Sequence, residues 1–237
     1  MITAVIPAYN VEKTIRNVIK ETKKYCDNII VIDDGSRDNT GKVVKEEGIK
    51  LITHKKNKGL GAALRTGFNA AINCKSDIIL TLDSDGQHNP NEIPRFLNAI
   101  SKGYDFVLGE RDLKKYPLIK KIGNFFLNVM TNIISGTTLN DTESGFRAFS
   151  SYGLKRIYPY LRANRYEIAS EIIFAVGLYN IKYTNVKISS PVYVKGVTIR
   201  GGIRNFLYML HRRKRDLKSY VQDSKYILRK WLKRFGF

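Results

Sequence analysis

Cysteine is scarce in this chain of 237 residues: only Cys26 and Cys74 are present, far apart and outside any metal-ligand spacing. A disulfide framework and a cysteine-based zinc module are therefore excluded. Long apolar runs are also missing, because no stretch approaches the roughly 20 apolar residues that a membrane-spanning helix needs. Neither end has the pattern of a signal peptide. The expectation is a globular protein that remains on the cytoplasmic side of the membrane.

Acidic residues are few, since 21 Asp and Glu stand against 41 Lys and Arg, for a formal net charge of +20. Between Arg200 and Phe237 there are 12 Lys and Arg and two Asp, so this segment carries +10, half of the excess. Apolar residues such as Leu207 and Trp231 recur between these cations. The pattern predicts a basic amphipathic helical tail over 201–237 that associates with an anionic membrane surface. The charge alone also fits a nucleic-acid-binding protein.

Short β-branched runs alternate with amphipathic stretches in the first part of the chain, which predicts an α/β fold with a mainly parallel central sheet flanked by helices. The expected strands are 3–6, 28–33, 51–52, 77–82 and 105–109, and the expected helices are 11–24, 39–47, 61–73 and 90–100. Ligands bind such sheets at the carboxyl ends of the strands.

After Arg111 the spacing changes, and apolar residues recur every three or four positions from Leu118 to Ile134. This spacing predicts a helix whose apolar stripe faces the core, with a second contact with the membrane surface as the alternative. A loop is expected over 141–147. Further on, a second amphipathic helix is expected at 167–178, with Glu167 and Glu171 as surface acids on one of its faces, and strands are expected at 182–187 and 192–195.

Two carboxylates, Asp83 and Asp85, flank a single residue at the end of an apolar strand, so in extended geometry both fall on one side of the backbone. Mg²⁺ or Mn²⁺ takes one or two carboxylates and completes its coordination with water and substrate phosphates. An isolated Asp-x-Asp more often ends a strand in a solvated turn. The buried strand before it and Gly86-Gln87-His88 after it favour a metal site.

A second polar cluster, Asp33-Asp34-Gly35-Ser36, follows the strand 28–33. Asp-Gly is a common turn signal, and Ser36 or Asp38 is expected to cap the next helix. Asp34 is then left to accept hydrogen bonds from a base or ribose, with Pro7 and Tyr9 as one wall of a nucleotide slot.

Five segments together carry a resemblance to a known family: Pro7-Ala8-Tyr9-Asn10, 31–40, 57–63, Asp83-Ser84-Asp85-Gly86-Gln87-His88 and 141–147. In this order they resemble the family-2 glycosyltransferases with the GT-A (Rossmann-like) fold, closest to the polyprenyl-phosphate (dolichyl-phosphate) mannose and glucose synthases. The resemblance covers roughly residues 1–195. It implies a catalytic domain over 1–200, with 201–237 as the appended tail.

The resemblance also implies roles for individual residues. Nucleotide binding is expected of Pro7, Tyr9, Asn10, Glu12, Asp34, Asp83 and Ser84, and metal binding, with Mg²⁺ or Mn²⁺ as cofactor, of Asp83, Asp85 and Gln87. Many relatives have Glu directly after the Asn; here Val11 stands in that place and Glu12 follows, so the role of Glu12 is the weaker assignment.

The implied reaction is the inverting transfer of a hexose from a nucleoside diphosphate sugar, with GDP-mannose as the leading expectation, to a polyprenyl or dolichyl phosphate. A phosphate monoester, with a second pKa of about 6, is already ionised at neutral pH and needs no catalytic base. Cations are needed instead. Expected beside Asp83 and Asp85 are Arg111 and Arg147 for the leaving diphosphate, and Arg147, Lys195, Arg200 and Arg204 for the acceptor phosphate.

Several alternatives remain open. The donor is a UDP-sugar carrying glucose or an N-acetylhexosamine, or the acceptor is a hydroxyl group whose proton is taken by an unidentified carboxylate. A noncatalytic module of the same fold is a further alternative, and a nucleic-acid-binding protein is a remote one, because it leaves the acids at the strand ends unexplained. The expected location is the cytoplasmic face of the membrane, as a peripheral protein with or without a membrane protein partner.

Overall fold

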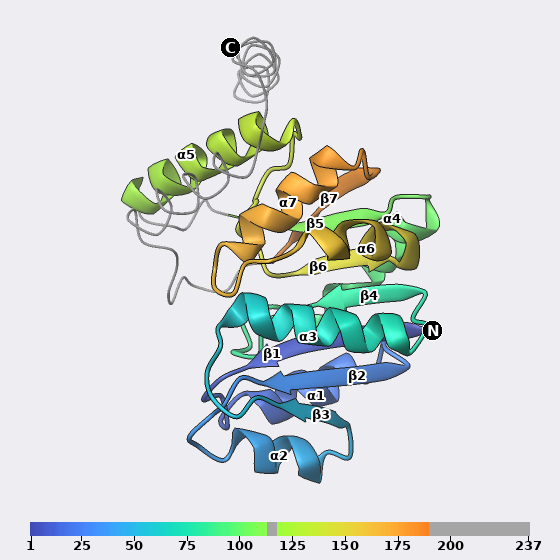
Figure 1. Ribbon diagram of the computed structural model, residues 1–237, viewed down its shortest axis with the longest axis vertical. Helices are drawn as coiled ribbons and strands as arrows, with labels where there is room; N and C mark the ends of the chain where they lie inside the picture. Colours follow the sequence, from blue (N-terminus) through green and yellow to red (C-terminus); the bar gives the residue numbers. More distant parts are fainter. Residues whose placement is uncertain (113–117, 190–237) are drawn as a thin grey trace.

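A seven-stranded sheet forms the centre of the molecule in this computed structural model, which describes residues 1–112 and 118–189 (Figure 1). The strand order is β3-β2-β1-β4-β6-β5-β7, and β6 alone runs antiparallel to its two neighbours, β4 and β5. The strands are β1 (Ile2–Ala8), β2 (Asn28–Asp33), β3 (Lys50–Thr53), β4 (Ile78–Thr81), β5 (Phe106–Arg111), β6 (Arg147–Ser150) and β7 (Tyr183–Ile188). The predicted α/β class with a mainly parallel sheet is confirmed.

Helices cover both faces of the sheet. They are α1 (Ile15–Thr22), α2 (Thr40–Glu46), α3 (Leu60–Asn73), η1 (Pro90–Glu92), α4 (Ile93–Ser101), α5 (Leu118–Ser135), α6 (Ser151–Ile157), η3 (Tyr158–Tyr160) and α7 (Ile168–Leu178). One apolar cluster joins the sheet to α3, α6 and α7, and another joins it to α1, α2 and α4. Successive residues of β1 enter alternate clusters, Val5 the first and Ile6 the second, as a strand buried on both faces requires.

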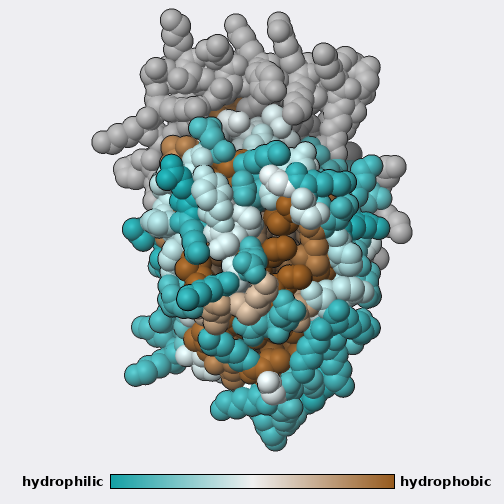
Figure 2. Space-filling view, turned by 90° about the vertical axis from the view of Figure 1, so that its right-hand side faces the viewer, coloured by the Kyte–Doolittle hydropathy of each residue, from teal (hydrophilic) through white to brown (hydrophobic). Residues whose placement is uncertain are grey.

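The carboxyl ends of β1, β2 and β4 lie on the side of the molecule opposite the N-terminus (Figure 1). Figure 2 shows the side on which the N-terminus lies, where hydrophilic residues cover most of the surface and hydrophobic ones gather near the middle. In the parts of the chain that the structure describes, no helix is both long and apolar enough to cross a membrane.

The predicted element ranges hold with small shifts. The strand expected at 28–33 has those bounds, whereas the helix expected from residue 11 begins at Ile15. Three short elements were not predicted: the strand β6, which begins where a loop was expected to end, and the short helices α6 and η3. A strand of four residues that starts with an arginine has little periodicity to reveal it. The strand expected at 192–195 and the tail 201–237 lie outside the described residues.

The prediction that the apolar stripe of 118–134 faces the core is wrong for the N-terminal half of α5. Ile122, Phe125 and Phe126 are 54%, 42% and 59% exposed, whereas Asn128 and Asn132 are 3% and 0% exposed. The two asparagines are buried because they satisfy backbone groups of the loop that follows the helix. That requirement decides which side of α5 packs inward.

Candidate functional site

The loops that follow β1 and β2 are tied together by hydrogen bonds between each other's side chains and backbone. With the donor first, these are Asn10 N to Ser36 Oγ (3.0 Å), Arg37 N to Asn10 Oδ1 (2.8 Å), Val11 N to Thr40 Oγ1 (2.8 Å), Glu12 N to Asp38 Oδ2 (3.1 Å) and Asn39 N to Glu12 Oε2 (2.9 Å). Asn10 has a φ of 53°, a left-handed conformation that asparagine tolerates. Asn10 and Glu12, both predicted to bind nucleotide, therefore also shape the cleft.

Asp34 is 3% exposed, and both of its carboxylate oxygens accept hydrogen bonds. Oδ1 contacts His54 Nδ1 at 2.6 Å and accepts from Lys58 N at 2.9 Å, and Oδ2 accepts from Gly59 N at 2.7 Å. Gly59 has a φ of 98°, which favours glycine. In this geometry Asp34 holds the loop that leads into α3, and its contact with a nucleotide stays a prediction.

His54 is a buried residue that the sequence analysis missed. Its Nε2 lies 3.0 Å from Thr66 Oγ1 on α3, while Nδ1 contacts Asp34. A single histidine at the end of a short strand has no sequence signal that separates it from a solvated one. Its importance follows only from the packing of β3 beside β2.

A pocket of about 480 Å³ opens over the ends of β2 and β3. It is lined by Tyr9, Gly35, Ser36, Arg37, Thr53, His54, Lys55, Lys56 and Asn57. The lining has three Lys and Arg, no Asp or Glu, and the rings of Tyr9 and His54, a composition suited to a nucleoside with a negatively charged group attached. Tyr9 belongs to this lining, while Pro7 is buried within β1.

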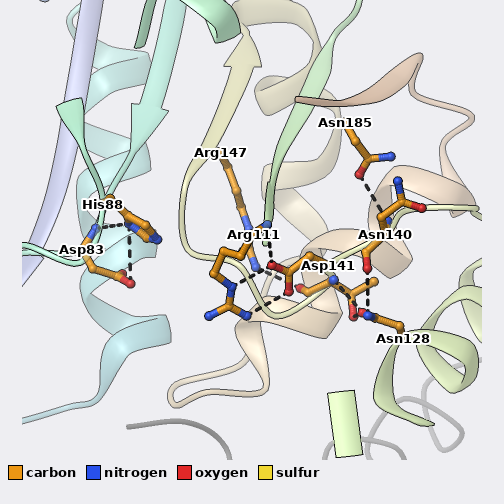
Figure 3. A network of polar contacts seen from close by, with 9 residues as sticks. Asp83, His88, Arg111, Asn128, Asn140, Asp141, Arg147 and Asn185 are labelled. Carbon is orange, nitrogen blue, oxygen red and sulfur yellow. Dashed lines mark hydrogen bonds and ion pairs between the residues drawn. The ribbon is translucent and has the colours of Figure 1, made fainter. Parts of the chain in front are cut away.

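Asp83 follows β4 at the edge of the cleft, and its side chain is 40% exposed (Figure 3). The Asp83 backbone N–H donates to His88 Nδ1 at 3.0 Å. Because Nδ1 accepts this bond, it carries no proton. Nδ1 and Asp83 Oδ2, which are 3.7 Å apart, therefore do not form an ion pair. The Asp83 carboxylate packs directly over Gly145, where a Cβ would lie 2.6 Å from Oδ1.

Asp85 is exposed, and its carboxylate accepts hydrogen bonds from Gln87, from N at 3.0 Å and from Nε2 at 2.6 Å. No Lys or Arg forms an ion pair with Asp83 or Asp85 among the described residues. Carboxylate oxygens without an ion-pair partner suit a hard divalent ion. The two carboxylates therefore have the chemistry to hold Mg²⁺ or Mn²⁺, with Gln87 beside them, and metal binding by these three residues stays a prediction. Ser84, also predicted to bind nucleotide, is buried, and its carbonyl oxygen accepts from Thr14.

Arg111 ends β5 and forms a paired contact with Asp141 (Figure 3). Nε donates to Asp141 Oδ2 at 2.7 Å, Nη2 donates to Oδ1 at 2.8 Å, and the Arg111 backbone N–H adds a third bond at 3.1 Å. Asp141 is 1% exposed. Asp141 therefore fixes the position of the Arg111 guanidinium group. The sequence analysis assigned no role to Asp141, although it begins the 141–147 motif.

Arg147 begins β6 and is buried among acids. Burial lowers its pKa to about 10, opposed by the charges of Glu143, Asp83 and Asp141. Removal from water raises the pKa of Glu143, opposed by Arg147 and by a hydrogen bond from Ser170. Arg147 Nη2 donates to the Thr142 carbonyl at 3.3 Å, and its buried Nε has no hydrogen-bond acceptor among the described residues. The binding of the leaving diphosphate or of the acceptor phosphate by Arg147 stays a prediction.

The loop that precedes Glu143 is held by two asparagines of α5. Asn128 donates to the Asn140 carbonyl at 2.8 Å and accepts from the Thr142 N–H and hydroxyl at 2.8 and 2.7 Å. Asn132 donates to the Leu139 carbonyl at 2.7 Å and accepts from the Leu139 N–H at 3.0 Å. The position of Asp141 within this loop is therefore set by α5.

Glu171 is not the surface acid that the helix pattern predicted. It is 0% exposed and accepts hydrogen bonds from the backbone N–H groups of Arg162 and Ala163 at 2.9 and 2.8 Å. The loop that it holds packs against the start of α3, where a Cβ on Gly61 would meet the Ala163 carbonyl. Glu167, at the start of α7, is partly exposed. Lys195, Arg200 and Arg204 lie outside the described residues.

Comparison with known proteins gives concordant matches. The family model "Glycosyl transferase family 2" matches residues 3–156. An uncharacterized protein of Methanocaldococcus jannaschii is 40% identical over 84% of this chain and 85% of its own length. The UDP-N-acetylglucosamine–dolichyl-phosphate N-acetylglucosaminyltransferase of Methanococcus voltae is 36% identical over 89% of this chain and 95% of its own.

Among solved structures, the glucosyl-3-phosphoglycerate synthase of Mycobacterium tuberculosis, in complex with Mn²⁺, UDP-glucose and phosphoglyceric acid, superimposes with a TM-score of 0.71. It is 19% identical, and the match covers 90% of this chain and 81% of that one. At this identity the likeness shows the shared fold, which is the predicted GT-A fold.

Proposed function

Because this chain belongs to glycosyl transferase family 2, we propose that it transfers a sugar from a nucleoside diphosphate sugar to the phosphate of a polyprenyl or dolichyl phosphate. The observation that carries the proposal is the composition of the cleft. Asp83 and Asp85 form no ion pair with Lys or Arg among the described residues, while two cations belong to the same cleft: Arg147, which feels the charge of Asp83, and Arg111, which is paired with Asp141. Similarity to the Methanococcus voltae enzyme supports the lipid phosphate acceptor.

A UDP-N-acetylhexosamine is the donor that the comparisons favour. The Methanococcus voltae relative, which matches nearly the whole chain, is named for UDP-N-acetylglucosamine. GDP-mannose, the donor expected from the sequence, stays a prediction. The pocket lined by Tyr9 and His54 is where the nucleoside would bind, with Arg37, Lys55 and Lys56 available to its phosphates.

Asp83 and Asp85 are the residues that would hold Mg²⁺ or Mn²⁺. When bound, the ion stabilises the negative charge of the departing diphosphate as a Lewis acid. His88 fixes the backbone of Asp83, and Gln87 orients Asp85, so both carboxylates are placed before the donor arrives. Pre-positioned ligands avoid a reorganisation cost during the reaction.

The acceptor phosphate needs attraction rather than deprotonation. With a second pKa of about 6, its attacking oxygen is already ionised at neutral pH. Arg147 is a cation in water-poor surroundings, where its attraction for an anion is stronger than in bulk water. Attack on the anomeric carbon from the side opposite the diphosphate inverts the configuration of the sugar.

One observation favours a second candidate, a hydroxyl acceptor. The raised pKa of Glu143 is a property of general bases. Glu143 accepts a hydrogen bond from Ser170 and lies close enough to Arg147 for the two opposite charges to interact. This arrangement is typical of a carboxylate that balances the charge of an arginine. We therefore assign Glu143 to hold the charge of Arg147, and its substitution separates the two candidates.

An acceptor with an isoprenoid tail is met at a membrane surface. We propose that the protein acts as a peripheral protein on the cytoplasmic face, through the basic tail 201–237 and with or without a membrane protein partner. The support is the +10 charge of residues 200–237, which attracts an anionic surface.

The test uses the purified full chain with polyprenyl phosphate, Mn²⁺ and, in separate reactions, UDP-N-acetylglucosamine, UDP-glucose and GDP-mannose. We expect lipid-linked sugar in the organic extract with UDP-N-acetylglucosamine. In Asp85→Asn the rate falls about 100-fold or more, because the diphosphate loses its metal-held stabilisation. Glu21→Gln, which removes a surface carboxylate paired with Lys24, is the matched control and keeps its rate. No lipid-linked sugar with any donor, or full activity of Asp85→Asn, would contradict the proposal.

A further inference from the structure

A second pocket, of about 350 Å³, lies between α3 and the segment that follows α6. The α3 residues that line it recur at three- and four-residue spacing, so they share one side of the helix: Ala62, Arg65, Thr66 and Asn69. Among the described residues, this pocket has no lining residue in common with the pocket beside Tyr9, and it is therefore a separate cavity. Its volume suits a small molecule rather than a polymer.

Positive charge dominates the lining of this pocket. Lys58, Arg65 and Arg162 contribute to it, and none of the described residues around it is Asp or Glu. None of these three cations forms an ion pair within the parts of the chain that the structure describes. Like charges around a cavity repel one another, and an anion inside the cavity offsets that repulsion. The pocket therefore favours an anionic occupant.

Arg65 differs from an ordinary solvated cation because the protein holds it in place. It is half-buried on α3, and its Nη2 donates a hydrogen bond to the side-chain oxygen of Asn164. Its Nε is buried and has no acceptor among the residues described. Buried donors in native proteins nearly always have a partner, so this one indicates a partner that the chain itself does not supply. A guanidinium group in a fixed position suits a phosphate, which it binds through two parallel hydrogen bonds.

The remaining wall of the pocket is apolar and aromatic. Tyr158, Pro159 and Leu161 form it. The Tyr158 ring packs against the apolar cluster that contains Leu161, and this contact fixes the ring in place. A bare inorganic anion gains little from such a wall, whereas an anion attached to a ring or a carbon chain buries apolar surface against it. The lining therefore favours an organic anion over a simple one.

We propose that the pocket between α3 and residues 158–162 binds a phosphorylated small molecule, a phosphate monoester whose organic part is a ring or another compact apolar group. The phosphate lies among Lys58, Arg65 and Arg162, and the organic part lies against Tyr158. This site is additional to the donor and acceptor sites of the proposed function and does not depend on them. An occupant joins α3 to the segment 158–162, and because it binds only the folded chain it stabilises the fold.

The experiment measures binding of phenyl phosphate to the full chain by equilibrium dialysis at about pH 8, where a phosphate monoester carries close to two negative charges. Inorganic phosphate and benzoate are the comparison probes. We expect phenyl phosphate to bind at least about tenfold more tightly than inorganic phosphate, which has no ring to bury. It should exceed benzoate, which has the same ring but a single charge, by a similar factor. No binding of phenyl phosphate, or equal binding of benzoate, would overturn the proposal.

Variants of the lining cations locate the bound probe. Arg65→Gln should weaken phenyl phosphate binding at least about tenfold, since a charge-assisted hydrogen bond is lost. Arg162→Gln should weaken it at least about threefold, and because Arg162 is exposed, this change tests the site without disturbing the bond between Arg65 and Asn164. The matched control is Lys42→Gln, which removes one exposed cation on α2 and should bind as the wild type does.

Two results with these variants would contradict the assignment. Unchanged binding of phenyl phosphate in both Arg65→Gln and Arg162→Gln would overturn it. A loss of binding in Arg37→Gln, with Arg65→Gln unaffected, would place the probe in the pocket beside Tyr9 and would overturn it as well. Sugar transfer enters none of these measurements, so their failure and the failure of the proposed function are distinguishable.

Discussion

Gly145 offers a way to move one proposed metal ligand without removing it. A Cβ added there would lie 2.6 Å from Asp83 Oδ1 and 2.9 Å from Oδ2, where ordinary contact begins at 3.4 Å. The carboxylate of Gly145→Ala must therefore shift by about 0.8 Å, the difference between 3.4 and 2.6 Å. The φ of Gly145 is not positive, so alanine is allowed by the backbone. The change acts on the Asp83 side chain, which is 40% exposed and free to move.

The expected result is a weaker metal site in a folded protein. Displacing a ligand or its support typically lowers metal affinity 10- to 100-fold, or about 1.4–2.7 kcal/mol. Because the clash is with the end of a mobile side chain, the free energy of unfolding should change by less than about 1 kcal/mol. Mn²⁺ binding is measured directly by the electron paramagnetic resonance signal of the free ion. The rate of sugar transfer is then followed as Mn²⁺ is raised to saturation.

The matched control is Gly123→Ala, since a Cβ at Gly123 has no atom within 4 Å. Gly123→Ala should bind Mn²⁺ as the wild type does. If Gly145→Ala also bound Mn²⁺ with unchanged affinity, Asp83 would not be a ligand, and the reasoning would be refuted. A large loss of thermal stability in Gly145→Ala would show instead that the glycine serves the fold.

Two more predictions concern buried Arg147 and its partly buried neighbour Glu143. Glu143→Gln should keep within about tenfold of the wild-type kcat with a phosphate acceptor, because no base is needed; a loss of 100-fold or more, the scale of general base catalysis, would favour the hydroxyl acceptor. Arg147→Met should lower the free energy of unfolding at pH 7 by about 1–3 kcal/mol, because Glu143 and the Thr142 carbonyl lose a neighbouring cation. The pKa of Glu143, already raised by burial, rises further once the lowering effect of Arg147 is lost. The folded variant then keeps a proton on Glu143 that the unfolded chain releases above about pH 4. The loss of unfolding free energy relative to the wild type, measured in urea titrations, should therefore grow from about pH 4 to pH 7. A loss that does not change with pH would contradict the assignment of the effect to Glu143.

Much of the site was visible in the sequence because it depends on local features. Apolar runs, most of them four to six residues long, located the strands, and polar residues at their carboxyl ends located the candidate cleft. Asp83 and Asp85 were singled out as candidate metal ligands because a buried strand followed by two alternating carboxylates is an unusual combination. The 141–147 motif pointed to Arg147. These features depend on spacing of a few residues, which the sequence displays directly.

Other features depend on what packs against a residue. His54 became significant only when β3 placed it beside Asp34, and Glu171 proved buried because two backbone N–H groups of a neighbouring loop need an acceptor. The strand order, with β6 antiparallel between β4 and β5, also joins segments distant in the chain.

Helix α5 shows most clearly which features depend on the sequence alone and which depend on the tertiary structure. Its spacing determined that a helix would form and which residues share its apolar side. Periodicity describes the two sides of a helix but not which of them meets the protein. That choice was made by the tertiary structure, since the unsatisfied backbone groups of the loop before Glu143 required Asn128 and Asn132 on the inside, leaving Ile122 and Phe126 on the surface.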